Sequence, residues 1–174
     1  MSDSFDAFLA SIEAPALRAI AQHWNAARGP QLLPSWETLR LEELPQPARL
    51  TWIYAYDPAT GKFTGRLSGE QITKAFGKSF HGLPLELAHT GAIYLWVHHA
   101  LTRVVSEPAA YRSTGKLYKQ AGRIIEGERI ALPLGSDGRT GDGIIGASWF
   151  MDPYLEGPIE LLAENESWCP LRGS

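Results

Sequence analysis

The segment from Leu50 to Tyr56 restricts the fold of this chain more than any other, because it is apolar on both of its faces. In an extended strand, successive side chains point to opposite faces of the sheet. Trp52 and Tyr54 would therefore lie on one face, and Ile53 and Ala55 on the other. Strands of this kind belong to sheets that are covered on both sides. The sequence predicts a sheet held between two layers.

The residues that follow predict an antiparallel hairpin. Asp57-Pro58-Ala59-Thr60-Gly61 has the composition of a turn, and 62–67 alternates as a returning strand. Later β-rich segments predict three further strands at 109–118, 123–134 and 144–151. Gly122 and the glycine-rich run 135–143 separate them. We therefore expect five strands.

Two amphipathic helical segments precede the hairpin. Apolar residues recur at helical spacing over 5–12 and again over 15–28, where Gly29-Pro30 ends the second helix. The apolar stripe of the second helix consists of Leu17, Ile20, Ala21 and Trp24. Repeated prolines in 31–47 predict an extended connector on the surface of the core.

Two further helices are expected between the hairpin and the later strands. Ser68-Gly69-Glu70-Gln71 has the form of a capping box, in which the Ser and Gln side chains would bind free backbone N–H groups of a helix ending at Phe76. A longer helix is expected from Gly91 to Val105, with Pro108 just after its end.

Composition excludes several classes of protein. The 174 residues are 44% hydrophobic, as in one compact domain with its own core, and the net charge of −3 disfavours binding to nucleic acid. One cysteine, Cys169, permits neither an intramolecular disulfide nor a cysteine-rich zinc site, and the five histidines have no metal-binding spacing. No apolar run is long enough for a bilayer, and the acidic N-terminus is unlike a secretory signal. We expect a cytoplasmic protein without membrane insertion.

Three stretches match motifs of a known family. They are Phe63 to Gly82, Val105-Ser106-Glu107-Pro108, and Ile130 to Gly138. The first resembles an Arg-Leu-x-Gly signature followed by a Phe-Gly motif, the second a bend before a strand, and the third an apolar-Pro-Leu hairpin. Together with the element order over about residues 15–150, they resemble the PAS domain, and in particular a bacterial family of small single-domain PAS proteins.

The resemblance implies an α+β fold. Its core would be a five-stranded antiparallel sheet in the order 2-1-5-4-3, with connecting helices on one face. The N-terminal helices would cover the other face or mediate dimerisation. The chain would then divide into N-terminal helices and connector (1–48), a PAS-like core (49–152) and a C-terminal tail (153–174), within a single domain.

In this fold, aromatic side chains would surround the space between helices and sheet, where small ligands bind. Arg66 and Arg129 lie in strands between apolar neighbours, and a guanidinium at the cavity would hold a carboxylate or phosphate. The ligand-binding candidates are Trp52, Tyr54, Phe63, Arg66, Phe76, Phe80, Trp96, His99, Tyr111, Arg129 and Trp149. The alternative is that the aromatic residues fill the core and both arginines reach solvent.

The resemblance also suggests a cofactor and a dimer contact. Some PAS-like sensors bind haem through one histidine of the helix at 91–105, which makes His99 a candidate axial ligand. No other cofactor and no metal is expected. The candidate contact of a homodimer is the stripe Leu17, Ile20, Ala21 and Trp24, and packing within one chain would explain the same stripe.

These features favour a sensory or interaction module that binds a small apolar or amphiphilic molecule, or a signalling protein partner, and catalyses nothing. Occupancy of the cavity would shift the packing of helices on the sheet and so bias the N-terminal helices. One alternative is a small enzyme that uses the same cavity, with His99 or His81 as general base. Another is an unliganded structural or assembly domain.

Overall fold

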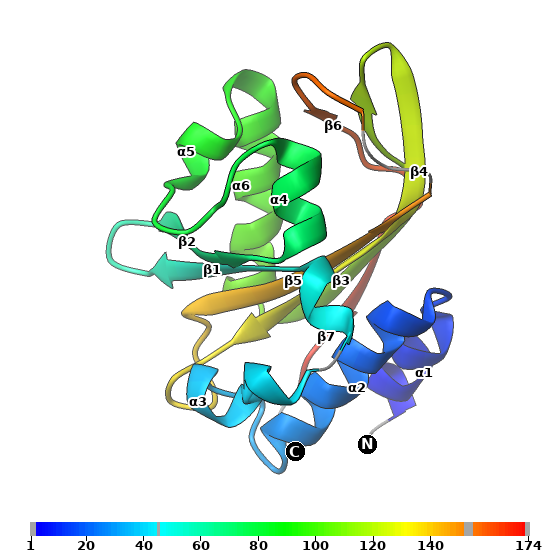
Figure 1. The fold of residues 1–174 in the computed structure, drawn as a ribbon. Coiled ribbons are helices and arrows are strands. Elements are labelled where there is room, and N and C mark those ends of the chain that lie inside the picture. Colours follow the sequence, from blue (N-terminus) through cyan, green and yellow to red (C-terminus); the bar gives the residue numbers. More distant parts are fainter. Residues whose placement is uncertain (1–2, 45, 152–154, 173–174) are drawn as a thin grey trace.

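The computed structural model describes residues 3–44, 46–151 and 155–172. In these residues, seven antiparallel strands form one sheet with helices on both of its faces (Figure 1). The strands are β1 (Thr51–Asp57), β2 (Lys62–Ser68), β3 (Ala109–Gln120), β4 (Arg123–Leu134), β5 (Gly143–Phe150), β6 (Glu160–Leu161) and β7 (Ser167–Pro170). They lie in the order β2-β1-β5-β4-β3-β6, and β7 also pairs with β3. The expected order 2-1-5-4-3 of the five main strands and the α+β class are confirmed.

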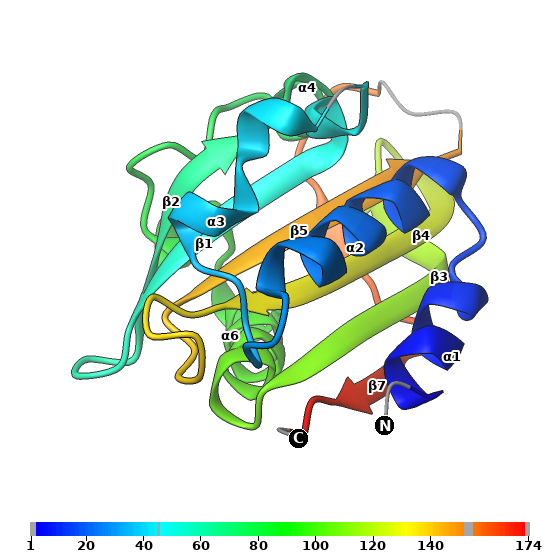
Figure 2. The same cartoon turned by 90° about the horizontal axis from the view of Figure 1, so that it is seen from below.

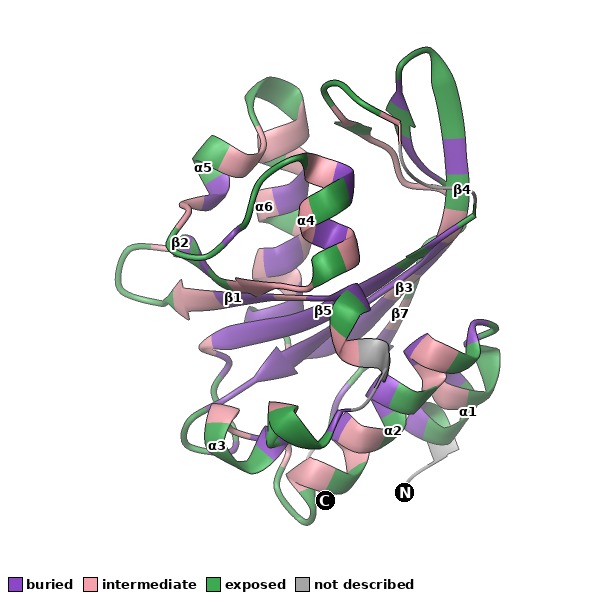
Figure 3. Cartoon of the chain, in the orientation of Figure 1, coloured by how far each residue is buried: buried purple, intermediate pink, exposed green. Residues whose placement is uncertain are grey.

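The centre of the sheet is buried on both faces. β5 and the second half of β4 are enclosed along nearly their whole length (Figure 3). Their side chains divide into two hydrophobic clusters, since Ile130, Leu132 and Ile145 pack in one and Ala131 and Ile144 in the other. Adjacent residues of one strand therefore serve opposite cores, as alternation requires.

The N-terminal part of the chain covers one face of the sheet. It forms α1 (Asp3–Ser11), α2 (Pro15–Arg28), α3 (Trp36–Leu39) and two 3-10 helices (Leu41–Glu43 and Gln46–Leu50). α2 lies across β4 and β5 (Figure 2). Pro15 occupies its first turn, and Gly29 ends it with a φ of 53°, a value that favours glycine.

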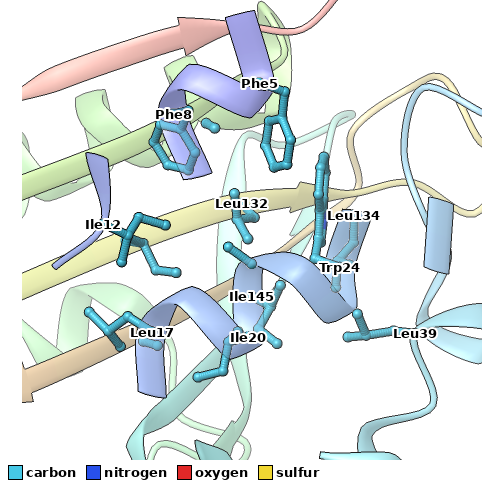
Figure 4. Packing of buried hydrophobic residues seen from close by; sticks show 14 of the residues in the cluster. Phe5, Phe8, Ile12, Leu17, Ile20, Trp24, Leu39, Leu132, Leu134 and Ile145 are labelled. Carbon is cyan, nitrogen blue, oxygen red and sulfur yellow. The ribbon is translucent and has the colours of Figure 1, made fainter. Parts of the chain in front are cut away.

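The apolar stripe of α2 is used within the chain. Leu17, Ile20, Ala21 and Trp24 are each at most 1% exposed, and Figure 4 shows Ile20 and Trp24 beside side chains of β4 and β5. The Trp24 indole N–H also donates to the carbonyl of Pro133 at 2.9 Å. These residues were candidates for a dimer contact, and that assignment is wrong because the sheet of the same chain already covers them.

The opposite face is covered by α4 (Glu70–Phe76), α5 (Leu85–Ala88) and α6 (Gly91–Ser106). α6 contacts β3, β4 and β5. Buried Val97, Leu101 and Val104 lie on its sheet-facing side. No helix in the described ranges has the length and apolar character needed to span a bilayer.

The expected capping box at Ser68 is absent, because Ser68 is the last residue of β2 and Gly69 is the N-cap of α4. The Ser68 hydroxyl instead lies 2.8 Å from the Thr73 hydroxyl and accepts from the backbone N–H of Phe80 at 3.0 Å. Ser68 therefore fastens the segment that carries Phe80 to the end of β2.

The C-terminal segment is part of the sheet and not only a tail. β6 pairs with the far end of β3, and β7 pairs with its first residues. The ring of Trp168 in β7 lies 4.8 Å from that of Tyr111, and the Arg103 guanidinium stands 4.1 Å from the Trp168 ring centroid. Both strands cover an edge of β3 that would otherwise expose free backbone groups.

A tryptophan pair tests the importance of the N-terminal layer. Replacing Trp24, which is fully buried, by Ala should lower the free energy of unfolding by about 3–5 kcal/mol. The matched change Trp149→Ala, at a side chain that is 40% exposed, should cost about 1 kcal/mol or less. Urea unfolding followed by circular dichroism measures both. Equal losses would show that α2 does not belong to the core.

Candidate functional site

A cavity of about 70 Å³ lies between the sheet and the helices α4 to α6. Seven of the residues expected at a ligand site line it: Trp52, Tyr54, Phe76, Phe80, Trp96, Tyr111 and Arg129. The other lining residues are Leu85, His89, Val97, Ala100, Leu101, Val104, Tyr118, Ala131, Ser148, Phe150 and Leu161. The wall is almost entirely apolar, as in sites that bind small molecules.

Two aromatic candidates lie elsewhere. Phe63 is buried, but its ring packs 4.6 Å from that of Tyr56 near the turn of the hairpin. Trp149 is 40% exposed because Ser148 and Phe150, its neighbours on β5, take the positions that face the cavity. Residue type suggested Trp149, whereas strand alternation selects Ser148.

Arg66 and His99 also lie outside the cavity. Arg66 is exposed, and its guanidinium stands 4.1 Å from the ring centroid of Trp36 in the N-terminal layer. His99 is exposed on α6, whereas Trp96 and Ala100 of the same helix line the cavity. A haem in this cavity would not meet the His99 ring in this arrangement.

The backbone explains why Trp52 lies flat on the sheet. A Cβ at Gly146 would collide with the Trp52 ring, so only glycine leaves space for the indole at that point of β5. The indole N–H donates to the Ser148 hydroxyl at 3.0 Å. Gly146 lies within the strand that the sequence predicts at 144–151, and the structure shows that it accommodates a large ring there.

A polar row crosses the otherwise apolar wall. Ser113, Arg129 and Ser148 are paired across β3, β4 and β5, so their side chains point to the same face. All three are buried. The Arg129 guanidinium donates to the carbonyls of Leu162 at 3.3 Å and Leu117 at 3.1 Å. Burial lowers the pKa of Arg129, while nearby Tyr111 opposes that shift.

Two tyrosine hydroxyls differ in their surroundings. The Tyr54 hydroxyl has no hydrogen-bond partner among the described residues, although Tyr54 is only 2% exposed, and burial raises its pKa. Burial also raises the pKa of Tyr111, but Ser113 and Arg129 partly oppose the rise because they lie near its hydroxyl. Tyr54 therefore offers a free donor inside the cavity.

His89 is the histidine that lines the cavity, and no sequence pattern pointed to it. Burial, the charge of Arg129 and the charge of Lys78 lower its pKa to about 4, so the imidazole is neutral at pH 7. Its ring packs edge-on against Phe76 at 5.8 Å and Phe80 at 6.4 Å. The other histidine considered as a general base, His81, is exposed, and its Nδ1 lies 2.8 Å from the carbonyl of Arg66.

The cavity wall offers one permanent cation, several hydroxyls and a neutral imidazole. It contains no carboxylate, and no group of three or more metal-binding side chains occurs in the described residues. This set of groups is suited to holding a small molecule by one polar end.

A buried ion pair lies behind the cavity, on the other face of the sheet. Glu128 contacts Arg112 at 2.6 Å and accepts from the backbone N–H groups of Glu13 and Ala14 at 3.1 and 2.7 Å. Ala14 is the N-cap of α2, and its own side chain cannot cap the helix. Since Glu128 precedes Arg129 on β4, one strand holds the start of α2 on one face and the cavity cation on the other.

Protonation of His89 should make stability depend on pH. The imidazole titrates near 6.5 when unfolded and near 4 when folded, so the unfolded state binds more protons as pH falls. Stability attributable to His89 is therefore present above pH 6.5 and is lost between pH 6.5 and 4, by up to about 3 kcal/mol. His89→Gln should remove this part of the slope in urea unfolding at several pH values. His99→Gln, at an exposed position outside the cavity, is the control for the substitution itself.

The unpaired hydroxyl of Tyr54 should lower the free energy of unfolding of the ligand-free protein. Tyr54→Phe removes a buried group without a partner, so it should leave the free energy of unfolding unchanged or raise it by about 1 kcal/mol. Tyr56→Phe, at a half-buried neighbour on β1, is the control and should change little. A loss above about 1 kcal/mol at Tyr54 alone would mean that its hydroxyl is bonded.

Comparison with known proteins agrees with the architecture. The family model described as PAS domain matches residues 12–148, which include α2, β1 to β4, most of β5 and the helices around the cavity. No curated protein and no solved structure matches the chain. The sheet order and the family match together show that the chain belongs to the PAS domain family.

Proposed function

We propose that this PAS domain is a sensory module that binds a small molecule in its cavity and catalyses no reaction. The observation that carries the proposal is the unpartnered Tyr54 hydroxyl in a buried space that also contains the Arg129 guanidinium. Nearly all buried polar groups in proteins have a hydrogen-bond partner. A ligand that enters the cavity would supply one.

The shared strand β4 supports a route for the signal. A molecule bound to Arg129 would contact β4 from one face of the sheet. On the other face, Glu128 of the same strand binds the backbone at the start of α2. Two buried layers packed on one strand respond to its displacement together, because close-packed interiors transmit strain. The proposed output is a change in how firmly the start of α2 is held.

The composition of the wall favours binding over catalysis. Acid–base catalysis needs a group positioned to take a proton and, commonly, a second group that orients it. His89 is the imidazole at the cavity, and no hydrogen bond from a described residue orients its ring. His81 and His99, the bases considered from the sequence, are both exposed and outside the cavity.

The homodimer and the signalling partner stay proposals without an assigned surface. The stripe expected to form a dimer contact is buried in one chain, so a second copy would have to use another face. Native mass spectrometry, which detects a bound ligand, also reports the number of chains in the assembly.

Filling the cavity tests binding and signalling together. Ala100 lines the cavity on α6, so Ala100→Leu would occupy its space, whereas Ala92→Leu places the same side chain on the exposed side of that helix. Native mass spectrometry of the purified proteins should find a small molecule, lost on denaturation, in the wild type and Ala92→Leu but reduced in Ala100→Leu.

Hydrogen exchange supplies the second measurement. Ala100→Leu should change the exchange of the Glu13 and Ala14 amides, whereas Ala92→Leu should not. A wild-type protein that carries no molecule, with exchange at these amides unaffected by the filled cavity, would favour an unliganded structural domain instead.

A further inference from the structure

We propose that the ligand is a short monocarboxylic acid, with its carboxylate against Arg129 and its hydrocarbon body along the apolar wall of the cavity. This inference rests on the proposed function and specifies the class of molecule that the site takes.

The charge of Arg129 has no carboxylate beside it. The residue is 8% exposed, and its guanidinium donates to two neutral backbone carbonyls. Among the described residues, no Asp or Glu carboxylate lies within 4.0 Å of the Arg129 guanidinium. The ion pairs between these residues involve other arginines. Glu166 acts on Arg129 only from beyond that distance and is itself exposed. Buried charges are normally paired, so an anion is the missing partner.

The surroundings of Arg129 suit a carboxylate. The guanidinium presents donors in a planar fork that matches two carboxylate oxygens. Ser148 stands opposite Arg129 on β5, and the Tyr111 hydroxyl lies near the guanidinium, so both hydroxyls can donate to the same anion. The indole N–H of Trp52 already donates to Ser148, which leaves the Ser148 proton available.

The rest of the wall limits the anion to a single charge. Among the described residues that line the cavity, Arg129 is the only lysine or arginine. His89 is neutral at pH 7 because its pKa is lowered to about 4. A dicarboxylate or a phosphate dianion would bring a second charge into an apolar space without a counterion. Such a charge is costly to bury.

The size of the cavity favours a small body. Its free volume is about 70 Å³, and apolar side chains make up nearly all of its wall. Butyrate is a small probe of this kind. Its three-carbon chain would lie against the side chains of Phe80, Val97 and Leu101, which line the cavity.

The test compares butyrate with butyramide, which has nearly the same shape and no charge. Isothermal titration of the full chain should give saturable binding of butyrate. Butyramide should bind about ten- to a hundredfold more weakly, since it lacks the charge-assisted hydrogen bonds. Octanoate and inorganic phosphate should each bind more weakly than butyrate, one because of its length and the other because of its charge and lack of an apolar body.

Two variants locate the site. Arg129→Met should remove the preference for butyrate over butyramide, whereas Arg66→Met, at an exposed arginine outside the cavity, should keep it. Circular dichroism checks the fold of both. If Arg129→Met does not fold, Arg129→Lys serves instead, and it should weaken butyrate binding because the planar fork is lost.

Three results would overturn the inference: butyramide binding as tightly as butyrate, phosphate binding more tightly than butyrate, or no binding of any compound. If nothing binds but native mass spectrometry still finds an occupant that Ala100→Leu excludes, the carboxylate class is wrong and the sensory function stands. If neither method finds an occupant, both proposals fail.

Discussion

The structure depends on the burial of its central strands from both sides. The buried apolar residues of β5 and of the second half of β4 alternate between two cores, so the N-terminal helices and the helices α4 to α6 are fixed by a single backbone. The hydrophobic gain from covering both faces is the main term that holds this sheet together. Neither layer can be removed without exposing half of each strand.

The two layers are packed differently. On the N-terminal side, Trp24 fills the space above the sheet and bonds to a β4 carbonyl. On the other side, aromatic rings leave a cavity, its wall includes the polar Arg129 and Ser148, and Ser113 continues this polar row on β3. A sequence optimised for stability alone would place apolar side chains there, since buried charges are often replaced without loss. The departure from that pattern is the reason to look for function in this layer.

Much of the fold could be predicted from sequence, because turn chemistry and alternation are local. β4 has the expected bounds, and the hairpin of β1 and β2 ends at the expected turn. β6 and β7 were not predicted, since pairing with β3 depends on residues more than 40 positions away. The site was predicted in part. Aromatic type identified Trp52 and Phe80 correctly as lining residues but misplaced Trp149, and His89 lies at the cavity only because α5 and α6 meet there.

The adjacency of Glu128 and Arg129 has a thermodynamic consequence. Suppose that a molecule in the cavity changes the affinity of α2 for a second binding partner. That partner must then change the affinity of the cavity for the molecule by the same factor. A protein that docks on the N-terminal helices would therefore tune what the domain senses, and input and output would be interchangeable roles of one equilibrium.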